Sequence, residues 1–313
     1  MKTVVIAGAS GFIGNNFRHQ FTAAGWQIRT VGRTAADNDA VWGQTDAIAQ
    51  LLEGSDLLVN LAGKSVSCRY TRANKAEIIR SRNETTAELG RAVAACSRPP
   101  RDWFNASTGT IYRDARDRPQ DEYDGDLGSG FSVGVARGWE ETLASAHTPA
   151  TRRIPLRISI AMGPGGGVMR PLNILARLGL GGRMGDGEQK YSWVHVDDLF
   201  RAVLFLHGHS QITGPVNIAA PEVVTNAGLM AAVRGANRIP RALPTPAWLL
   251  RMGAVLLRTE TELVLKSRWV VAQKLQDAGF TWKHPELARA LADIQAHSCA
   301  RDNGAWYKNS VAP

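Results

Sequence analysis

Three glycines near the start of the chain have the spacing of a phosphate-binding turn. Gly8, Gly11 and Gly14 stand in the segment GASGFIG, directly after the apolar run TVVIA and before an amphipathic stretch that ends near Ala24. Such glycines permit a tight turn, a close approach of the backbone to a pyrophosphate and close helix–sheet packing, while N–H groups at the helix N-terminus face the phosphates. An ordinary strand–helix turn is the alternative, but the order strand, glycines, helix and second strand favours a dinucleotide site.

Arg33 indicates which dinucleotide this turn would bind. It follows the second apolar run, QIRTV at residues 27–31, and stands where an NAD site carries an acidic residue; Asp37 comes later, in a loop. A carboxylate there would bind the ribose 2′-hydroxyl of NAD, whereas a guanidinium suits the 2′-phosphate of NADP. The sequence therefore favours NADP, with Arg29 as either a second contact or a solvated surface residue.

A basic segment is the first candidate for a substrate contact. CRYTRANKAEIIRSR begins just after a predicted buried strand, and in doubly wound folds ligands bind beyond the carboxyl ends of the strands. Arg69 and Tyr70, with Lys75, would then form an anion pocket. An exposed basic helix is the alternative interpretation.

The segment QKYSWVHVDDL is the second candidate. Tyr191 and Trp193 would line a substrate pocket together with His195, although His195 fits better as part of a helix start because two aspartates follow it. No metal is expected, since His207 and His209 have a metal-like HxH spacing without an evident third ligand.

The elements that must position these residues alternate between strand and helix. This alternation predicts a doubly wound parallel sheet. The predicted strands lie at 3–7, 27–31, 56–63, 102–108, 155–162 and 214–220, and the predicted helices at 45–53, 73–96 and 131–146. Glycine-rich stretches at 163–167 and 179–188 read as linkers or as loops closing over a ligand. The last ninety residues read as mostly helical, in TNAGLMAAVRGA, PAWLLRMGAVLL, ELVLKSRWVVAQKLQDAG and PELARALADIQ.

These elements predict an α/β fold with a doubly wound Rossmann sheet and a smaller, mainly helical C-terminal part. Residues 1–162 would form the NADP-binding domain, and residues 189–220 would return to it. Residues 163–188 and 221–313 would form the second domain.

Composition narrows the function classes. The chain has 313 residues, of which 44% are hydrophobic, a net charge of +9 and a pI near 9.8. No apolar run approaches the ~20 residues of a membrane span, and the early glycines argue against a signal peptide. The arginines are scattered without interleaved aromatics, which argues against nucleic acid and for a phosphorylated cofactor or anionic substrate. Three widely spaced cysteines indicate neither zinc site nor disulfide framework, as in a reducing cytoplasm.

Several stretches together resemble one family. GASGFIG, NLAGKSVSCRYTRANKAEIIRSRNETTAEL, STGTIY, LRISIAMGPGGGVM and GEQKYSWVHVDDL are similar to the extended short-chain dehydrogenase/reductases, which are NAD-dependent epimerase/dehydratase-like, and within them to bacterial "epimerase family" proteins. AQKLQDAGFTWKHPELARAL resembles the small C-terminal domain of unknown function in this subfamily. The likeness runs from residue 3 to about 293 and implies a Rossmann domain, a smaller substrate domain and NADP.

The resemblance also implies residue roles. The cofactor would contact the glycine turn and the ends of the neighbouring strands, with Ser107 and Thr108 approaching the nicotinamide. The implied contacts are Gly8, Ser10, Gly11, Phe12, Ile13, Arg33, Leu61, Ala62, Gly63 and Ser107.

The proton-transfer residues of the wider superfamily are missing from the matching stretch. There a Tyr and a Lys four residues apart move the proton, and alignment of FSVGVARGWEE on Glu140 places Ser132 and Ala136 at their positions. Thr108 and Tyr112 are the remaining catalytic candidates. The hydroxyl of Thr108 would bind a substrate oxygen or cap the backbone, and the phenol of Tyr112 would either face the substrate or pack.

Two functions are therefore expected as alternatives. The first is an NADP-dependent oxidoreductase or epimerase of the short-chain type, acting on a small polar or anionic, nucleotide-sugar-like substrate in the cytoplasm. The second is a non-catalytic NADP(H)-binding sensor or scaffold that lost the acid. By analogy, a homodimer would form through the helices at 73–96 and 131–146.

Overall fold

The structure of the chain is a computed structural model that describes residues 1–244 and 265–301, the last four of these without their side chains. The helix predicted from PAWLLRMGAVLL lies outside the described residues.

A seven-stranded sheet forms the larger part of the molecule. Its order is β10-β6-β5-β4-β1-β2-β3, and every neighbouring pair is parallel. The strands are β1 (Thr3–Ala7), β2 (Gln27–Gly32), β3 (Ala40–Val41), β4 (Leu57–Asn60), β5 (Asp102–Thr108), β6 (Arg152–Ile158) and β10 (Val216–Ile218). From β1 the chain adds β2 and β3 on one side and then β4, β5, β6 and β10 on the other. This order confirms the predicted doubly wound Rossmann sheet.

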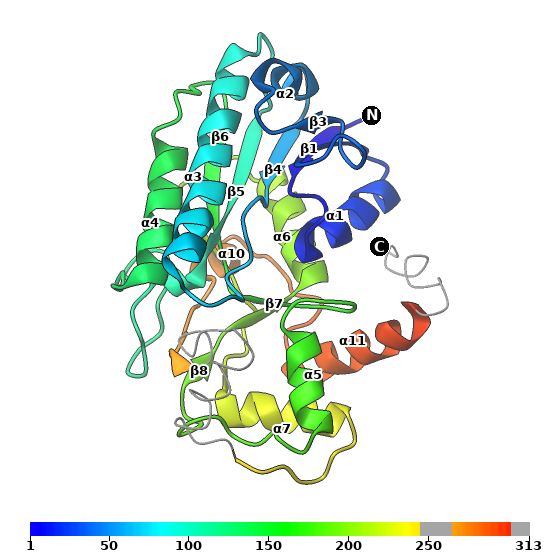
Figure 1. Cartoon of the computed structure of the whole chain (residues 1–313), viewed down its shortest axis with the longest axis vertical. Helices are drawn as coiled ribbons and strands as arrows, with labels where there is room; N and C mark the ends of the chain where they lie inside the picture. Colours follow the sequence, from blue (N-terminus) through cyan, green and yellow to red (C-terminus); the bar gives the residue numbers. More distant parts are fainter. Residues whose placement is uncertain (245–264, 302–313) are drawn as a thin grey trace.

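Helices cover both faces of the sheet (Figure 1). α1 (Phe12–Ala23) and α6 (Val196–Gly208) lie on one face, and α2 (Thr45–Leu52), α3 (Arg72–Ala95) and α4 (Phe131–Ala144) lie on the other. The strands must therefore be apolar on both sides, and all five residues of β1 are buried. Val4 and Ile6 pack with Phe17 of α1, whereas Val5 packs with Ile48 of α2.

A second, smaller core lies below the carboxyl ends of the strands in the view of Figure 1. α5 (Met169–Arg177), α7 (Asn226–Ala236) and α11 (Leu287–Arg301) surround it. Two short sheets complete it: β7 (Ile160–Met162) pairs with β9 (Trp193–His195), and β8 (Lys190–Tyr191) pairs with β11 (Val224–Thr225). The division of the chain into two domains stays a prediction.

The helix predicted for ELVLKSRWVVAQKLQDAG is wrong over most of its described length. Only α10 (Gln273–Asp277) and the residue at the edge of the described range are helical, and residues 266–272 run extended. The cause is pairing with distant segments: Arg268 bridges Tyr191, and Ser192 Oγ bonds the N–H of Val270 at 2.7 Å. These bonds satisfy the backbone of an apolar, β-branched stretch without a helix.

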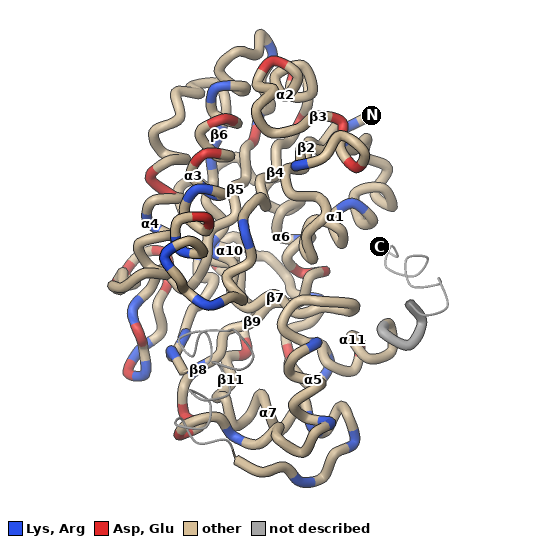
Figure 2. The backbone as a smooth tube through the Cα atoms, in the orientation of Figure 1, with Lys and Arg blue, Asp and Glu red and all other residues tan. Residues whose placement is uncertain are grey.

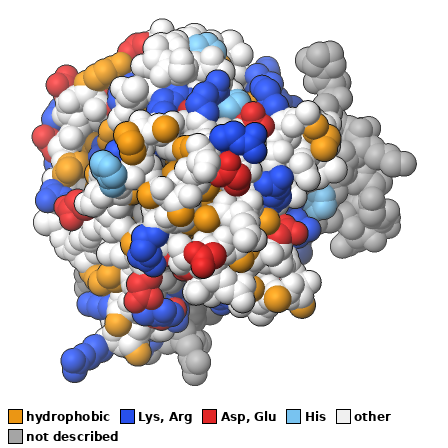
Figure 3. Space-filling model, turned by 90° about the horizontal axis from the view of Figure 1, so that it is seen from above, with side chains coloured by type: hydrophobic (Ala, Val, Ile, Leu, Met, Phe, Trp, Pro, Cys, Tyr) orange, Lys and Arg blue, Asp and Glu red, His pale blue; other side chains and the backbone are white. Residues whose placement is uncertain are grey.

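The charged residues are distributed over the whole molecule. Lys and Arg alternate with Asp and Glu along the backbone trace (Figure 2), and the same mixing is seen on the face that Figure 3 presents. Of the helices that the structure describes, none combines the length and apolar character needed to cross a membrane.

Candidate functional site

A cavity of about 440 Å³ opens at the carboxyl ends of the central strands. Its walls are the glycine turn after β1, the segment after β4, the end of β5 and the inner face of α4. Of the predicted cofactor and substrate residues, those that line it are Gly8, Gly11, Phe12, Ile13, Leu61, Gly63, Tyr70, Ser107 and Thr108. The parallel register explains this gathering, because strands that run the same way end at the same edge of the sheet.

The three glycines of the turn have three separate structural roles. Gly8 has φ +82°, and a Cβ there would lie 2.8 Å from the backbone of Leu61 and Ala62. A Cβ on Gly14 would strike the backbone of the turn itself, so this position holds α1 against β1. A Cβ on Gly11 would meet only Gly8 O, at 3.4 Å, so its outer side is open. The turn therefore fits a pyrophosphate at the N-terminus of α1.

The glycine-rich loop at 163–167 packs against this turn. A Cβ on Gly166 would lie 2.8 Å from the ring of Phe12, and one on Gly167 would lie 2.9 Å from the same ring. These contacts argue against a flexible linker, and closure of the loop over a ligand stays a prediction. The Phe12 ring joins the turn to the segment that leads into α5.

Arg33 and Ser10 are exposed and lie outside the cavity lining. Arg33 follows β2 directly, and the N–H of Gly8 bonds the carbonyl of Val31 at 3.1 Å, so Arg33 leaves the sheet beside the glycine turn. That position suits a contact with the outer, ribose end of a dinucleotide. Arg29 has another partner, since its guanidinium donates to Leu51 O at 2.7 Å.

Tyr112 lies outside the cavity, in a buried polar network. Its side chain is 1% exposed, its hydroxyl donates to Asn217 Oδ1 at 3.0 Å and accepts from Arg157 Nη1 at 3.0 Å. Burial raises the pKa of Tyr112. Of the two predicted roles, these contacts correspond to packing, and Tyr112 directly follows the short helix η1 (Gly109–Ile111) at the end of β5.

Thr108 both faces the cavity and caps the backbone, the two roles that the sequence left as alternatives. It lines the cavity, and its Oγ1 also accepts the N–H of Thr110 at 3.1 Å. Thr110 lines the cavity as well, and its own hydroxyl accepts from Arg268 Nε at 3.1 Å. Two hydroxyls therefore stand together at the end of β5, fixed by local bonds.

Of the four predicted substrate residues, one lines the cavity and three do not. Tyr70 lines the cavity, whereas Arg69 is exposed and lies outside it. Tyr191 and Trp193 are buried in the second core, at 5% and 0% exposure, and neither lines the cavity. Both side chains point from β8 and β9 into that core, so the predicted pocket wall is wrong for these two residues.

Arg82 is a cavity residue that the sequence did not single out for a role. Its guanidinium is stacked over the Trp139 ring at 5.0 Å, and a Cβ on Gly63 would lie 3.1 Å from its Cζ. Nη1 donates to the carbonyls of Lys64 and Ile78, both at 3.0 Å. Burial lowers the pKa of Arg82 to about 10, and within the described chain no carboxylate is within ion-pair distance. A long helix rich in Arg gave no signal for which guanidinium turns inward.

The helix positions that lack the superfamily's Tyr and Lys do face the cavity. Ser132 and Ala136 both line it, and the hydroxyls of Ser132 and Tyr70 lie 3.4 Å apart. Glu140, one turn further along α4, is paired with Arg157 through two hydrogen bonds of 2.9 and 2.8 Å. Ser107 Oγ donates to the same carboxylate at 2.6 Å.

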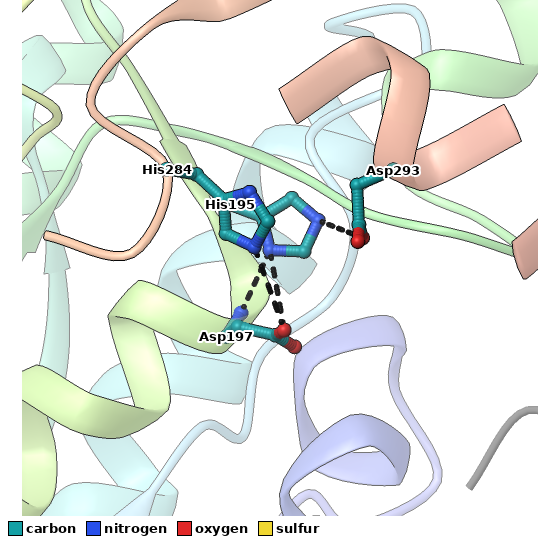
Figure 4. A group of neighbouring side chains, drawn as sticks. All are labelled: His195, Asp197, His284 and Asp293. Atoms are coloured by element: carbon teal, nitrogen blue, oxygen red, sulfur yellow. Dashed lines mark hydrogen bonds and ion pairs between the residues drawn. The ribbon is translucent and has the colours of Figure 1, made fainter. Parts of the chain in front are cut away.

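Two histidines and two aspartates gather away from this cavity, between α6 and α11 (Figure 4): His195, Asp197, His284 and Asp293. His195 Nδ1 accepts the N–H of Asp197 at 3.2 Å as the N-cap of α6, so the proton of the neutral ring sits on Nε2, facing Asp293 Oδ2 at 3.6 Å. A metal ion would need the lone pair of that nitrogen. Lys283 already binds Asp197 at 2.9 Å. The geometry favours a proton-bearing network over a metal centre.

Family models and individual relatives point to the same protein family. The model of the "NAD dependent epimerase/dehydratase family" matches residues 4–219, and that of a "Domain of unknown function (DUF1731)" matches residues 245–294. "Epimerase family protein SDR39U1" of Bos taurus is 31% identical over 302 residues, covering 94% of this chain and 99% of the relative. "Epimerase family protein ML0860" of Mycobacterium leprae is 32% identical over 298 residues, covering 92% and 94%.

A solved structure has the same fold over nearly the whole chain. It is the crystal structure of human epimerase family protein SDR39U1 with NADPH, with a TM-score of 0.85, 27% identity, and coverage of 94% of this chain and 99% of the human chain.

Proposed function

Given that the chain belongs to the NAD dependent epimerase/dehydratase family, we propose that it binds NADP(H) and catalyses hydride transfer to or from a small polar or anionic substrate. The observation that carries the proposal is the continuity of one cavity from the open glycine turn to the hydroxyls at the end of β5 and the start of α4. A cofactor bound at the glycine turn and a substrate bound at the hydroxyls would lie next to each other inside this cavity.

Residues of the chain itself would hold the dinucleotide. The N–H groups at the start of α1 would bind the pyrophosphate, and Gly11 leaves room for its approach. Arg33 would bind the 2′-phosphate, because it is exposed and follows β2 directly, beside the glycine turn. The human relative was crystallised with NADPH, which supports the phosphorylated form.

The far end of the cavity would orient the substrate. When bound, a nicotinamide supplies or accepts a hydride. Thr108, Thr110 and Ser132 present hydroxyls that would bind a substrate carbonyl or alcohol oxygen. Arg82 would attract a substrate anion, because its charge has no carboxylate partner among the described residues.

One observation favours a second function, that of a non-catalytic NADP(H)-binding sensor or scaffold. Ser132 and Ala136 face the cavity from α4 without offering an acid or a base. A sensor would bind the dinucleotide and show no turnover on any carbonyl or alcohol offered. An enzyme would consume NADPH with at least one member of such a panel.

The test is calorimetric titration of NADPH and NADH into the wild-type protein and into Arg33→Ala. We expect a strong preference for NADPH that collapses in the variant, while NADH affinity changes little. Arg29→Ala is the matched control, since Arg29 bonds Leu51 and should leave the preference intact. Equal affinities for both dinucleotides in wild type contradict the assignment of Arg33, and binding of neither contradicts the proposed function.

A further inference from the structure

We propose that Tyr70 donates and accepts the proton in this cavity and that Arg82 is the positioning residue that stabilises its phenolate. The proposal rests on the proposed function, because it names the proton donor of the same site. It assigns to Tyr70 a catalytic role in place of the substrate contact expected from the sequence.

The first step is an inventory of the cavity wall. Among its described lining residues, Tyr70 and Arg82 have the only ionisable side chains; the other polar ones are serines, threonines and the indole of Trp139. An aliphatic hydroxyl binds a substrate oxygen but does not release a proton near neutral pH. Glu140 is nearby but is committed to Arg157 by two hydrogen bonds. A guanidinium keeps its proton, so the phenol is left as the group that can exchange one.

The second step is the position of the phenol. The Tyr70 ring packs edge-on against Phe131 at 4.8 Å, and its hydroxyl lies 3.4 Å from Ser132 Oγ. Phe131 and Ser132 form the first turn of α4, where the positive end of the helix dipole favours an anion. The phenol therefore comes from the loop after β4 but is held at the start of the helix that borders the cavity.

The third step is the charge beside it. Tyr70 is the one group whose electrostatic interaction favours the charged form of Arg82, against the burial that disfavours it. This attraction is reciprocal, so the guanidinium favours the phenolate. The cation is also immobile, because the carbonyls of Lys64 and Ile78 hold Nη1.

The proton balance of the step is simple. Reduction of a carbonyl substrate adds one hydride, from reduced nicotinamide, to carbon and one proton, from Tyr70 Oη, to oxygen. The phenolate that remains is stabilised by Arg82 and regains its proton from water. In the reverse direction the Tyr70 phenolate accepts the proton of the alcohol.

The first test needs no cofactor. Ultraviolet difference titration follows tyrosinate formation, and with 5 tyrosines in the chain the difference between wild type and Tyr70→Phe isolates Tyr70. Arg82→Gln should shift this titration to higher pH, and Arg82→Lys should restore part of the difference. Identical titration of Tyr70 in wild type and Arg82→Gln overturns the coupling.

The second test is kinetic. With a substrate found by screening NADPH consumption, Tyr70→Phe should lower kcat about 10²–10⁴-fold while NADPH affinity is unchanged. Tyr123→Phe is the matched control, because Tyr123 is 60% exposed and its hydroxyl bonds Asp277 on the surface. Retained kcat in Tyr70→Phe overturns the catalytic role. If wild type binds no NADPH or turns nothing over, the proposed function has failed, and the titration alone then decides the Tyr70–Arg82 coupling.

Discussion

Glu140 and Arg157 face each other through two nearly parallel hydrogen bonds, Oε1 to Nε at 2.9 Å and Oε2 to Nη2 at 2.8 Å. Their side chains are 14% and 9% exposed, so the pair joins α4 to β6 out of contact with most solvent. Ser107 and Tyr112 add one hydrogen bond each, to the carboxylate and to the guanidinium. The acid of the FSVGVARGWE stretch therefore has a structural partner, Arg157.

Removal of the Glu140 carboxylate should lower the stability of the fold. We expect Glu140→Ala to lower the free energy of unfolding by about 3–5 kcal/mol, because it leaves the Arg157 charge buried without its counter-ion. Denaturation by urea, compared with Glu141→Ala on the exposed side of the same helix, measures the effect. A loss of less than about 1 kcal/mol shows that Arg157 finds a second partner or water.

Tyr112→Phe should affect stability and not chemistry. The variant loses the hydroxyl that links Arg157 to Asn217, and we expect a loss of about 1–3 kcal/mol in the free energy of unfolding. NADPH affinity and kcat should stay within twofold of wild type, because the phenol is buried outside the cavity lining. A large drop in kcat with stability intact means that Tyr112 acts in the reaction after all.

Gly8→Ala should abolish NADPH binding and destabilise the fold. The new Cβ would combine a left-handed φ with a collision at 2.8 Å against the end of β4. Gly25→Ala separates these effects, because Gly25 has φ +75° and nothing within 4 Å of its Cβ. We expect that control to lose about 1–3 kcal/mol from backbone strain alone and to bind NADPH normally. Calorimetry and thermal unfolding of both variants provide the comparison.

His195 should make stability depend on pH. Burial lowers the pKa of His195 from 6.5 to about 3, so below pH 6.5 the unfolded chain takes up a proton that the folded chain does not. The folded state therefore loses stability as the pH falls from about 6.5 towards about 3, by about 1.4 kcal/mol per pH unit. His195→Asn keeps an acceptor for the N–H of Asp197 and removes the titration. Equal acid sensitivity of wild type and His195→Asn in urea titrations contradicts this account.

The sequence predicted well what depends on local pattern. The run TVVIA is β1 to the residue, and the glycines after it have the separate roles that their spacing predicted. The parallel direction of the strands follows from the same alternation, because parallel strands need helical crossovers. Such features are encoded within about thirty residues, the length of one strand–helix–strand unit.

What the sequence did not predict depends on contacts between distant segments. Nothing in residues 266–272 shows that Ser192 and Gln120 will bind them as an extended strip. Tyr191 and Trp193 alternate as a pocket wall would, but the second core lies on their side of the chain. Arg82 is one basic residue among several in α3, and contacts with Trp139 of α4 and with the carbonyl of Lys64 in the loop after β4 distinguish it.

Gly63 and Arg82 lie in tight contact, since a Cβ on Gly63 would lie 3.1 Å from the guanidinium carbon and the arginine side chain would have to shift by a few tenths of an ångström. The two positions are 19 residues apart in sequence, in the loop after β4 and within α3. Across homologues, we expect them to covary: an arginine held in this position favours glycine in the loop, and a larger loop residue accompanies a shorter helix residue. Glycine in the loop together with arginine in the helix would then indicate, from the sequence alone, a chain that holds a cation in its cavity.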